Sequence, residues 1–208
     1  EKLVMTNLIF KLFTFQGTPV NLNLLFLIIF IITPIPIAVS IFISVILHEM
    51  AHAFVANRRG YRVYGIEVGL FSGSASIDSN IHERDSIPIT AAGPISNLTL
   101  YFIGMLISFV YPNTFIDSFM MVNLLLFVFN ILPIYPMDGG RILRDLLSIK
   151  SRKLGINRGQ AFSIAAKVSL VTSVLLIIVS VMSGFLFMAL FGAYFGYLAL
   201  KDLGIIKN

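Results

Sequence analysis

Long apolar segments without a charged residue set the pattern of this 208-residue chain. A helix needs about 20 apolar residues to cross a bilayer, and the charge-free segments 12–47 and 168–200 are each long enough for two crossings. Pro34 and Pro36 divide the first segment and Ser183-Gly184 the second, because these residues interrupt regular helices. The pattern predicts six membrane spans, which lie near 20–34, near 36–57, within 86–116, within 118–137 and, as a pair, within 168–200.

The basic residues agree with this layout. All 15 lysines and arginines fall in the termini and loops that six spans would place on one side of the membrane. Because basic residues collect on the cytoplasmic side, we expect an integral, multi-pass membrane protein with both termini in the cytoplasm. The net charge of +5 then reflects topology and attraction to anionic lipid, so a nucleic-acid partner is not expected.

Two segments have the composition of strands. Tyr61 to Ile77 is rich in β-branched and aromatic residues punctuated by glycine, which predicts a hairpin or small sheet at the membrane surface. Phe13 to Gln16 alternates apolar and polar side chains and predicts one more short strand. The expected fold class is an all-α polytopic membrane protein of six transmembrane helices. A small membrane-associated β-sheet follows the second span, and residues 1–208 form a single domain.

The chain has no cysteine, so a metal ion would need His, Asp or Glu ligands. His48 and His52 stand four residues apart inside the predicted second span, with Glu49 beside them. On a helix, residues with this spacing lie on one face, so both imidazoles can reach one ion while Glu49 deprotonates a water. Ionisable groups inside a span are costly unless they are compensated, which favours a metal site over chance.

A third ligand must come from elsewhere in the chain, because catalytic zinc usually has three protein ligands and one open position. Asp138 is the acidic residue whose surroundings suit this role, since prolines end the fourth span before it and Gly139-Gly140 permits a tight turn after it. Asp138 could instead, or in addition, be the N-cap of a helix over 139–148. Both roles are compatible with the sequence.

The motifs together resemble those of the site-2 proteases, a family of intramembrane zinc metalloproteases. The resemblance rests on His48-Glu49-x-x-His52, on Asn130-x-x-Pro133-x-x-Pro136-x-Asp138-Gly139-Gly140, and on the order of the two motifs. Gly93-x-x-x-Asn97 is similar to a further element of the family. The chain has no room for the inserted recognition domain or the appended nucleotide-sensing domain of some members, so we expect a compact form.

The resemblance implies specific roles. His48, His52 and Asp138 would bind one catalytic Zn²⁺ ion. Glu49 would be the general base and acid, and Asn130 would lie near the substrate carbonyl. The implied activity is that of an intramembrane endopeptidase, which cuts transmembrane segments of membrane-anchored regulatory proteins within the lipid bilayer. Neither the identity of the substrate nor an oligomeric state follows from the sequence.

Several alternatives stay open. Asn130 could join helices instead of acting on substrate, and this is the favoured role of Asn97. His82, in a charged loop, is expected to be solvated. A zinc transporter or channel would also place His and acidic residues in spans, but its ligands would be distributed along a path. A catalytically silent relative acting as a membrane chaperone would normally lack Glu49 or a ligand.

Overall fold

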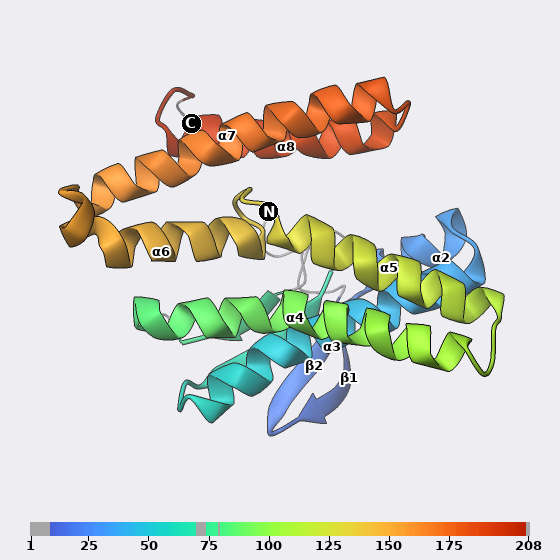
Figure 1. Ribbon diagram of the computed structural model, residues 1–208. Coiled ribbons are helices and arrows are strands. Elements are labelled where there is room, and N and C mark those ends of the chain that lie inside the picture. Colours follow the sequence, from blue (N-terminus) through green and yellow to red (C-terminus); the bar gives the residue numbers. More distant parts are fainter. Residues whose placement is uncertain (1–8, 70–73, 79, 207–208) are drawn as a thin grey trace. The chain divides into compact units, whose positions relative to one another are not determined.

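The computed structural model describes residues 9–69, 74–78 and 80–206, and the chain divides into two compact units (Figure 1). The first unit holds residues 1–81 and 92–128, and the second holds 82–91 and 129–208. The single-domain organisation stays a prediction. The elements are β1 (Ile9–Phe15), β2 (Thr18–Asn23), the 3₁₀ helix η2 (Leu24–Ile28), α2 (Ile29–Ile32), α3 (Ile35–Arg58), β3 (Val63–Val68), β4 (Ser74–Ile77), α4 (Glu83–Ser108), α5 (Thr114–Ile131), α6 (Asp138–Leu154), α7 (Arg158–Met182) and α8 (Leu186–Asp202).

Helix α3 is the central element of the first unit. Pro34 precedes its first residue and Pro36 lies in its first turn, where a missing backbone donor costs little. The helix ends at Arg58, and Gly60 follows with a φ of 83°, a left-handed conformation that suits glycine. The chain then turns back into β3, which packs on α3.

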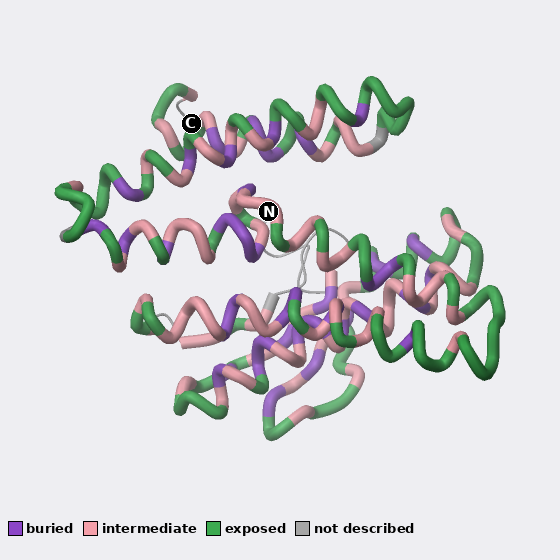
Figure 2. Tube along the Cα trace, in the orientation of Figure 1, coloured by how far each residue is buried: buried purple, intermediate pink, exposed green. Residues whose placement is uncertain are grey.

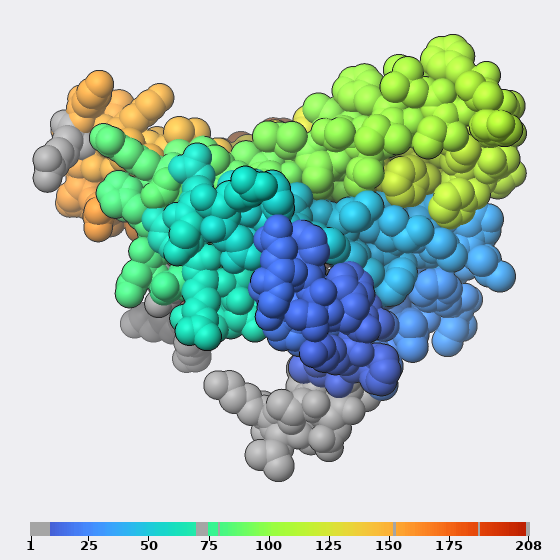
Figure 3. Space-filling model, turned by 90° about the horizontal axis from the view of Figure 1, so that it is seen from below, coloured from blue at the N-terminus to red at the C-terminus, as the bar shows by residue number. Residues whose placement is uncertain are grey.

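A four-stranded sheet with the order β1-β2-β3-β4 lies against α3. β1 and β4 pair antiparallel with their neighbours, whereas β2 and β3 are parallel. β2 buries alternate residues, and its Val20 and Leu22 lie in register with Ile66 and Val68 of β3. Leu22 and Val68 share one apolar core with Ile46 of α3, and Figure 3 shows the blue N-terminal strands seated against the lighter α3. The predicted strands near Phe13 and within 61–77 are confirmed, except that 70–73 lie outside the described residues.

The predicted membrane helix over 20–34 is wrong. Those residues form the end of β2, η2 and the single turn of α2. The segment from Thr18 to Asn23 alternates buried and partly buried positions, which is the period of a strand, and its β-branched residues and Pro19 disfavour a helix. The prediction relied on the absence of charge, which cannot separate a strand from a helix.

The second unit contains α6, α7 and α8. α7 begins with a capping box: the Asn157 side chain accepts a hydrogen bond from the Gln160 backbone, and the Gln160 side chain accepts one from the Asn157 backbone. α7 and α8 pack side by side as a hairpin (Figure 1). Ser183 caps α7 and Gly184 has a φ of 75°, which confirms the turn predicted there.

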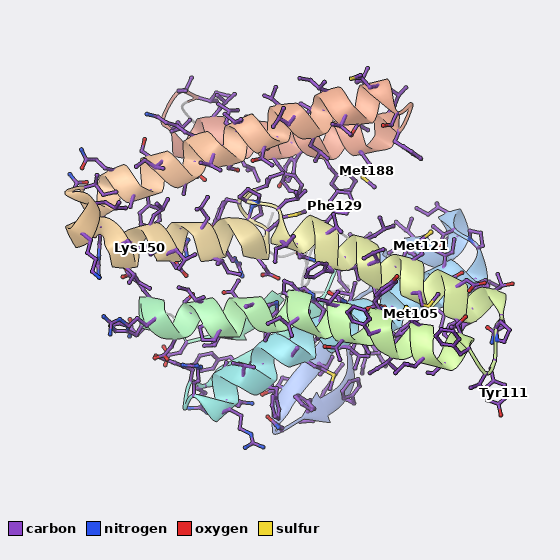
Figure 4. All side chains as sticks on the ribbon, viewed as in Figure 1. Met105, Tyr111, Met121, Phe129, Lys150 and Met188 are labelled. Carbon is purple, nitrogen blue, oxygen red and sulfur yellow. The ribbon has the colours of Figure 1, made fainter. Side chains whose placement is uncertain are left out.

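Within the described part of the chain, four helices are long and apolar enough to cross a membrane: α3, α4, α5 and α7. They match the predicted second to fifth spans, and α8, with 17 residues, lies where the sixth was expected. The apolar windows of α5 and α7 are only 11% and 22% buried. Met105 and Met121 are exposed on α4 and α5, and Tyr111 on the connection between them (Figures 2 and 4). Such large exposed apolar surfaces are typical of contact with lipid, so the chain is an integral membrane protein. Six spans were predicted, and the described residues contain four helices that meet the length and composition of a span.

Candidate metal centre

His48, Glu49 and His52 are buried together on α3. The Nε2 atoms of the two imidazoles lie 3.1 Å apart, and the rings are nearly perpendicular. Two nitrogens bound to one tetrahedral zinc ion at about 2.0–2.1 Å lie about 3.3 Å from each other. One ligand atom from each of the three residues lies within 4.8 Å of the other two, so this group could hold a metal ion.

Helix α4 approaches this pair at Gly93. A Cβ atom at position 93 would lie 2.5 Å from His48 Nε2 and would also overlap His52 Nε2. Both nitrogens therefore face Gly93, and the space that a side chain would fill there is called the hollow at Gly93 below. The spacing of the two donor nitrogens fits a metal ion.

Asn97, one turn after Gly93, contacts the other nitrogen of His48. Its Oδ1 lies 2.5 Å from His48 Nδ1, and its Nδ2 donates to Asn123 Oδ1 of α5. The role predicted for Asn97, joining helices, agrees with these contacts, which connect α3, α4 and α5. Asn123 was not predicted as a site residue. A polar side chain inside a predicted span was the available signal for Asn123, but the neighbouring sequence does not indicate which residues it contacts.

Asp138 begins α6 in the second unit, and its side chain is buried. The loop before it is closely packed: a Cβ at Gly140 would lie 2.5 Å from the Ile134 carbonyl carbon, and one at Gly139 would overlap backbone oxygens. Tyr135 N donates to Ser169 Oγ of α7. Gly139 and Gly140 were expected to permit a tight turn after Asp138. Instead both lie in the first turn of α6, where their missing side chains let the preceding loop approach closely. Asp138 stands at the start of a helix, as the capping alternative requires, while its role as a metal ligand stays a prediction.

Asn130 lies in the last turn of α5, also in the second unit, and is partly buried. Its proposed role beside the substrate stays a prediction. His82 is exposed just before α4, where its Nδ1 accepts a hydrogen bond from Arg84 N. His82 is thus in the solvated setting that the sequence predicted.

Comparison with known proteins identifies the family. The model of peptidase M50B-like proteins matches residues 22–137, more than half of the chain, and the model of peptidase family M50 matches residues 111–176. The chain belongs to the site-2 protease family. This assignment confirms the resemblance on which the functional expectations rest.

Individual relatives support this family assignment. Zinc metalloprotease MJ0392 of Methanocaldococcus jannaschii is 30% identical over 178 residues, which are 74% of this chain and 51% of that protein. Stage IV sporulation protein FB of Bacillus subtilis is 28% identical over 109 residues, 50% of this chain and 38% of that protein. The chain spans about half or less of the length of these relatives.

A solved structure shares the fold. The site-2 protease from Methanocaldococcus jannaschii superposes with a TM-score of 0.69 at 23% identity, and the match covers 96% of this chain and 97% of that one. The membrane helices and the small sheet therefore belong to one fold.

Proposed function

We propose that this chain is a zinc-dependent endopeptidase that hydrolyses peptide bonds within transmembrane segments of membrane-anchored proteins. The observation that carries the proposal is the buried His48–His52 pair, with its nitrogens 3.1 Å apart and Glu49 beside it, inside an apolar helix. His48 lies ten residues before Arg58, or about 15 Å from that end of α3 at 1.5 Å per residue. The pair would thus lie near the middle of a bilayer.

His48 and His52 would hold one zinc ion together with Asp138. The donor set of two imidazoles and one carboxylate is common among catalytic zinc sites. Asp138 is a buried carboxylate on a tightly packed loop, which suits a fixed ligand. Its ligand role rests on the family resemblance and on this local setting.

Glu49 would transfer the protons. When bound, zinc supplies Lewis acidity, which acidifies water and polarises a carbonyl oxygen. Glu49 accepts a proton from the attacking water and later delivers it to the nitrogen of the leaving amine. Its burial beside the histidines keeps the carboxylate within reach of the same point. Asn130 would hold the substrate carbonyl by donating a hydrogen bond from its amide.

The substrate class follows from this depth. A peptide bond that reaches the middle of the bilayer belongs to a transmembrane segment, and such a segment is helical because lipid offers its amides no partners. The helix must unwind locally, since helical carbonyls are shielded by their own hydrogen bonds. Family resemblance further suggests single-span regulatory proteins as substrates, cut in regulated intramembrane proteolysis.

A zinc transporter is less well supported. A transport path needs ligands spaced along it, whereas the described residues hold one compact group of three potential ligands, at His48, Glu49 and His52. Zinc flux into liposomes that contain the purified protein would favour the transporter.

The test replaces Glu49 by Gln. Because the carboxylate is assigned to proton transfer, cleavage of a transmembrane substrate should fall by at least about 100-fold, the usual minimum for general acid–base catalysis, while one zinc ion stays bound. Glu67→Gln, the same change on β3, is the matched control and should keep both activity and zinc. Near-normal cleavage by Glu49→Gln would refute the mechanism.

A further inference from the structure

A chain of buried side-chain hydrogen bonds leads away from the histidine pair and ends on backbone. His48 Nδ1 meets Asn97 Oδ1 at 2.5 Å, and Asn97 Nδ2 donates to Asn123 Oδ1 at 3.0 Å. Asn123 Nδ2 donates to Ser44 Oγ at 2.8 Å and to Phe119 O at 2.9 Å. Asn97, Asn123 and Ser44 are fully buried, so water does not compete for these bonds. The four side chains come from α3, α4 and α5 and lie within the first unit.

The backbone carbonyl of Phe119 gives this chain a direction. A carbonyl oxygen can only accept, so Asn123 must turn its NH₂ group toward Phe119 and its oxygen toward Asn97. Asn97 must then turn its own NH₂ group toward Asn123, because two facing oxygens would repel. The oxygen of Asn97 is left to face His48. Each amide orientation is thus set by the one before it.

His48 is the last residue in this chain of hydrogen bonds. Because Asn97 Oδ1 accepts, His48 Nδ1 must donate. A neutral imidazole carries one proton, and the nitrogen that faces Asn97 Oδ1 must hold it. His48 is therefore an Nδ1–H tautomer, and its Nε2 keeps the lone pair that points into the hollow at Gly93. Metal-binding histidines commonly have their other nitrogen fixed by such a partner, which orients the ring and raises its basicity.

We infer that Asn123, acting through Asn97, is a positioning residue that sets the tautomer of His48 for metal binding. The relay runs from Phe119 O through the two amides to the imidazole. This inference deepens the proposed function and rests on it, because it concerns the same metal site. Ser44 completes the relay by accepting the second amide hydrogen of Asn123.

The first test measures zinc affinity of the purified full chain by competition with a chelator. Asn97→Leu and Asn123→Leu should each weaken binding by about 10–100-fold, the range typical of partners behind a ligand. Asn123→Asp, unlike Asn123→Leu, should bind zinc within about threefold of the wild-type affinity. The neutral carboxyl of that variant reproduces one donor toward Phe119 and one acceptor toward Asn97. Ser40→Ala is the matched control, since Ser40 is a buried hydroxyl on α3 that donates only to the carbonyl of Pro36 in its own helix; it should leave the affinity unchanged.

The second test observes the tautomer of His48 directly, and its decisive measurement is made with the native Asn97 and Asn123 in place. The chain has three histidines, so ¹⁵N spectra of the metal-free, histidine-labelled protein can be assigned with His52→Gln and His82→Gln. His48 should appear as a single Nδ1–H tautomer, and Asn123→Leu should convert it into a mixture. A dominant Nε2–H tautomer in the wild-type protein overturns the inference. So does wild-type zinc affinity in a folded Asn123→Leu variant.

The outcomes separate this inference from the proposed function. If the variants change zinc affinity and tautomer as expected but the wild-type chain cleaves no transmembrane substrate, the relay stands and the peptidase proposal fails. If the chain cleaves substrate while Asn97→Leu and Asn123→Leu leave zinc affinity unchanged, the relay fails and the peptidase proposal stands.

Discussion

Replacing Gly93 by Ala tests whether the two imidazoles that face Gly93 hold the metal. The added Cβ would lie 2.5 Å from His48 Nε2, whereas ordinary contacts between carbon and its neighbours begin near 3.5 Å. Ring or helix must therefore move by about 1 Å. Protein ligands keep their distance from zinc to within about 0.2 Å, so a shift of this size is several times larger than the site tolerates.

We expect Gly93→Ala to lose much of its zinc affinity but little of its folding stability. We expect the zinc affinity to fall by at least about 100-fold, or about 2.8 kcal/mol at 1.4 kcal/mol per factor of ten. Overpacking a tight contact costs about 1–3 kcal/mol of stability. The better helix propensity of alanine offsets about 1 kcal/mol of that cost. The variant should remain folded.

The assay is zinc competition on the purified chain, with thermal unfolding of the metal-free protein as a check on the fold. Gly104→Ala is the control on the same helix, because its Cβ would meet the Met120 side chain, with Cγ at 2.7 Å, and a methionine can move aside. Gly104→Ala should bind zinc as the wild type does. Zinc binding by a folded Gly93→Ala within threefold of wild type would refute the assignment of the metal to this imidazole pair.

Three further expectations concern ligands, topology and substrate. Asp138→Ala should lower zinc content and activity together, whereas His82→Ala should change neither; full activity and metal in the former would leave Asp138 only a helix cap. Cysteines introduced into this cysteine-free chain should be labelled from the cytoplasmic side at Arg84 and from the opposite side at Asn113, and same-side labelling would contradict a membrane-spanning α4. Gly or Pro near the scissile bond should speed cleavage relative to Leu, and proline placed in the edge strand Ser74–Ile77 should impair cleavage without zinc loss if the unwound substrate pairs there. If substrates with strongly helical cleavage sites are cut as fast as those with Gly or Pro, unwinding is not required. If proline in Ser74–Ile77 does not change cleavage, the substrate docks at another part of the protein.

The sequence predicted those parts of the site that depend on local spacing. His48 and His52 are one helical turn apart in any helix, so their convergence on one side of α3 follows from the sequence alone. The glycines after Asp138 were visible in the sequence, but their role was not, because both are helical in α6 and make room for the backbone of the loop before it. Asn123 could not be found this way. Its contacts with Ser44 and Asn97 lie 79 and 26 residues away in sequence, and they exist only once three helices have packed.

The wrong helix at 20–34 has a physical explanation in the way this segment packs on α3. Gln16, before β2, accepts a hydrogen bond from Asn57 near the end of α3, while Phe26 and Phe30, further along, pack on Phe42. The segment from β2 to α2 therefore runs along α3 in the opposite direction. Its six strand residues, five 3₁₀ residues and four α-helical residues together rise about 36 Å, which is also the length of the 24-residue α3.

The segment thus follows α3 from Asn57 to Phe42 in a mixture of strand, 3₁₀ and α conformations. Such a path in lipid requires that its backbone groups find partners within the protein. β2 meets part of this requirement, since β1 pairs along one edge and β3 pairs with Val20 to Leu22 on the other. The charge pattern predicts that Lys11, before β2, lies on the same side of the membrane as Arg58, and this orientation stays a prediction. Charge separation along the sequence therefore reports where the long apolar segments lie, and only side-chain periodicity reports which secondary structure they form.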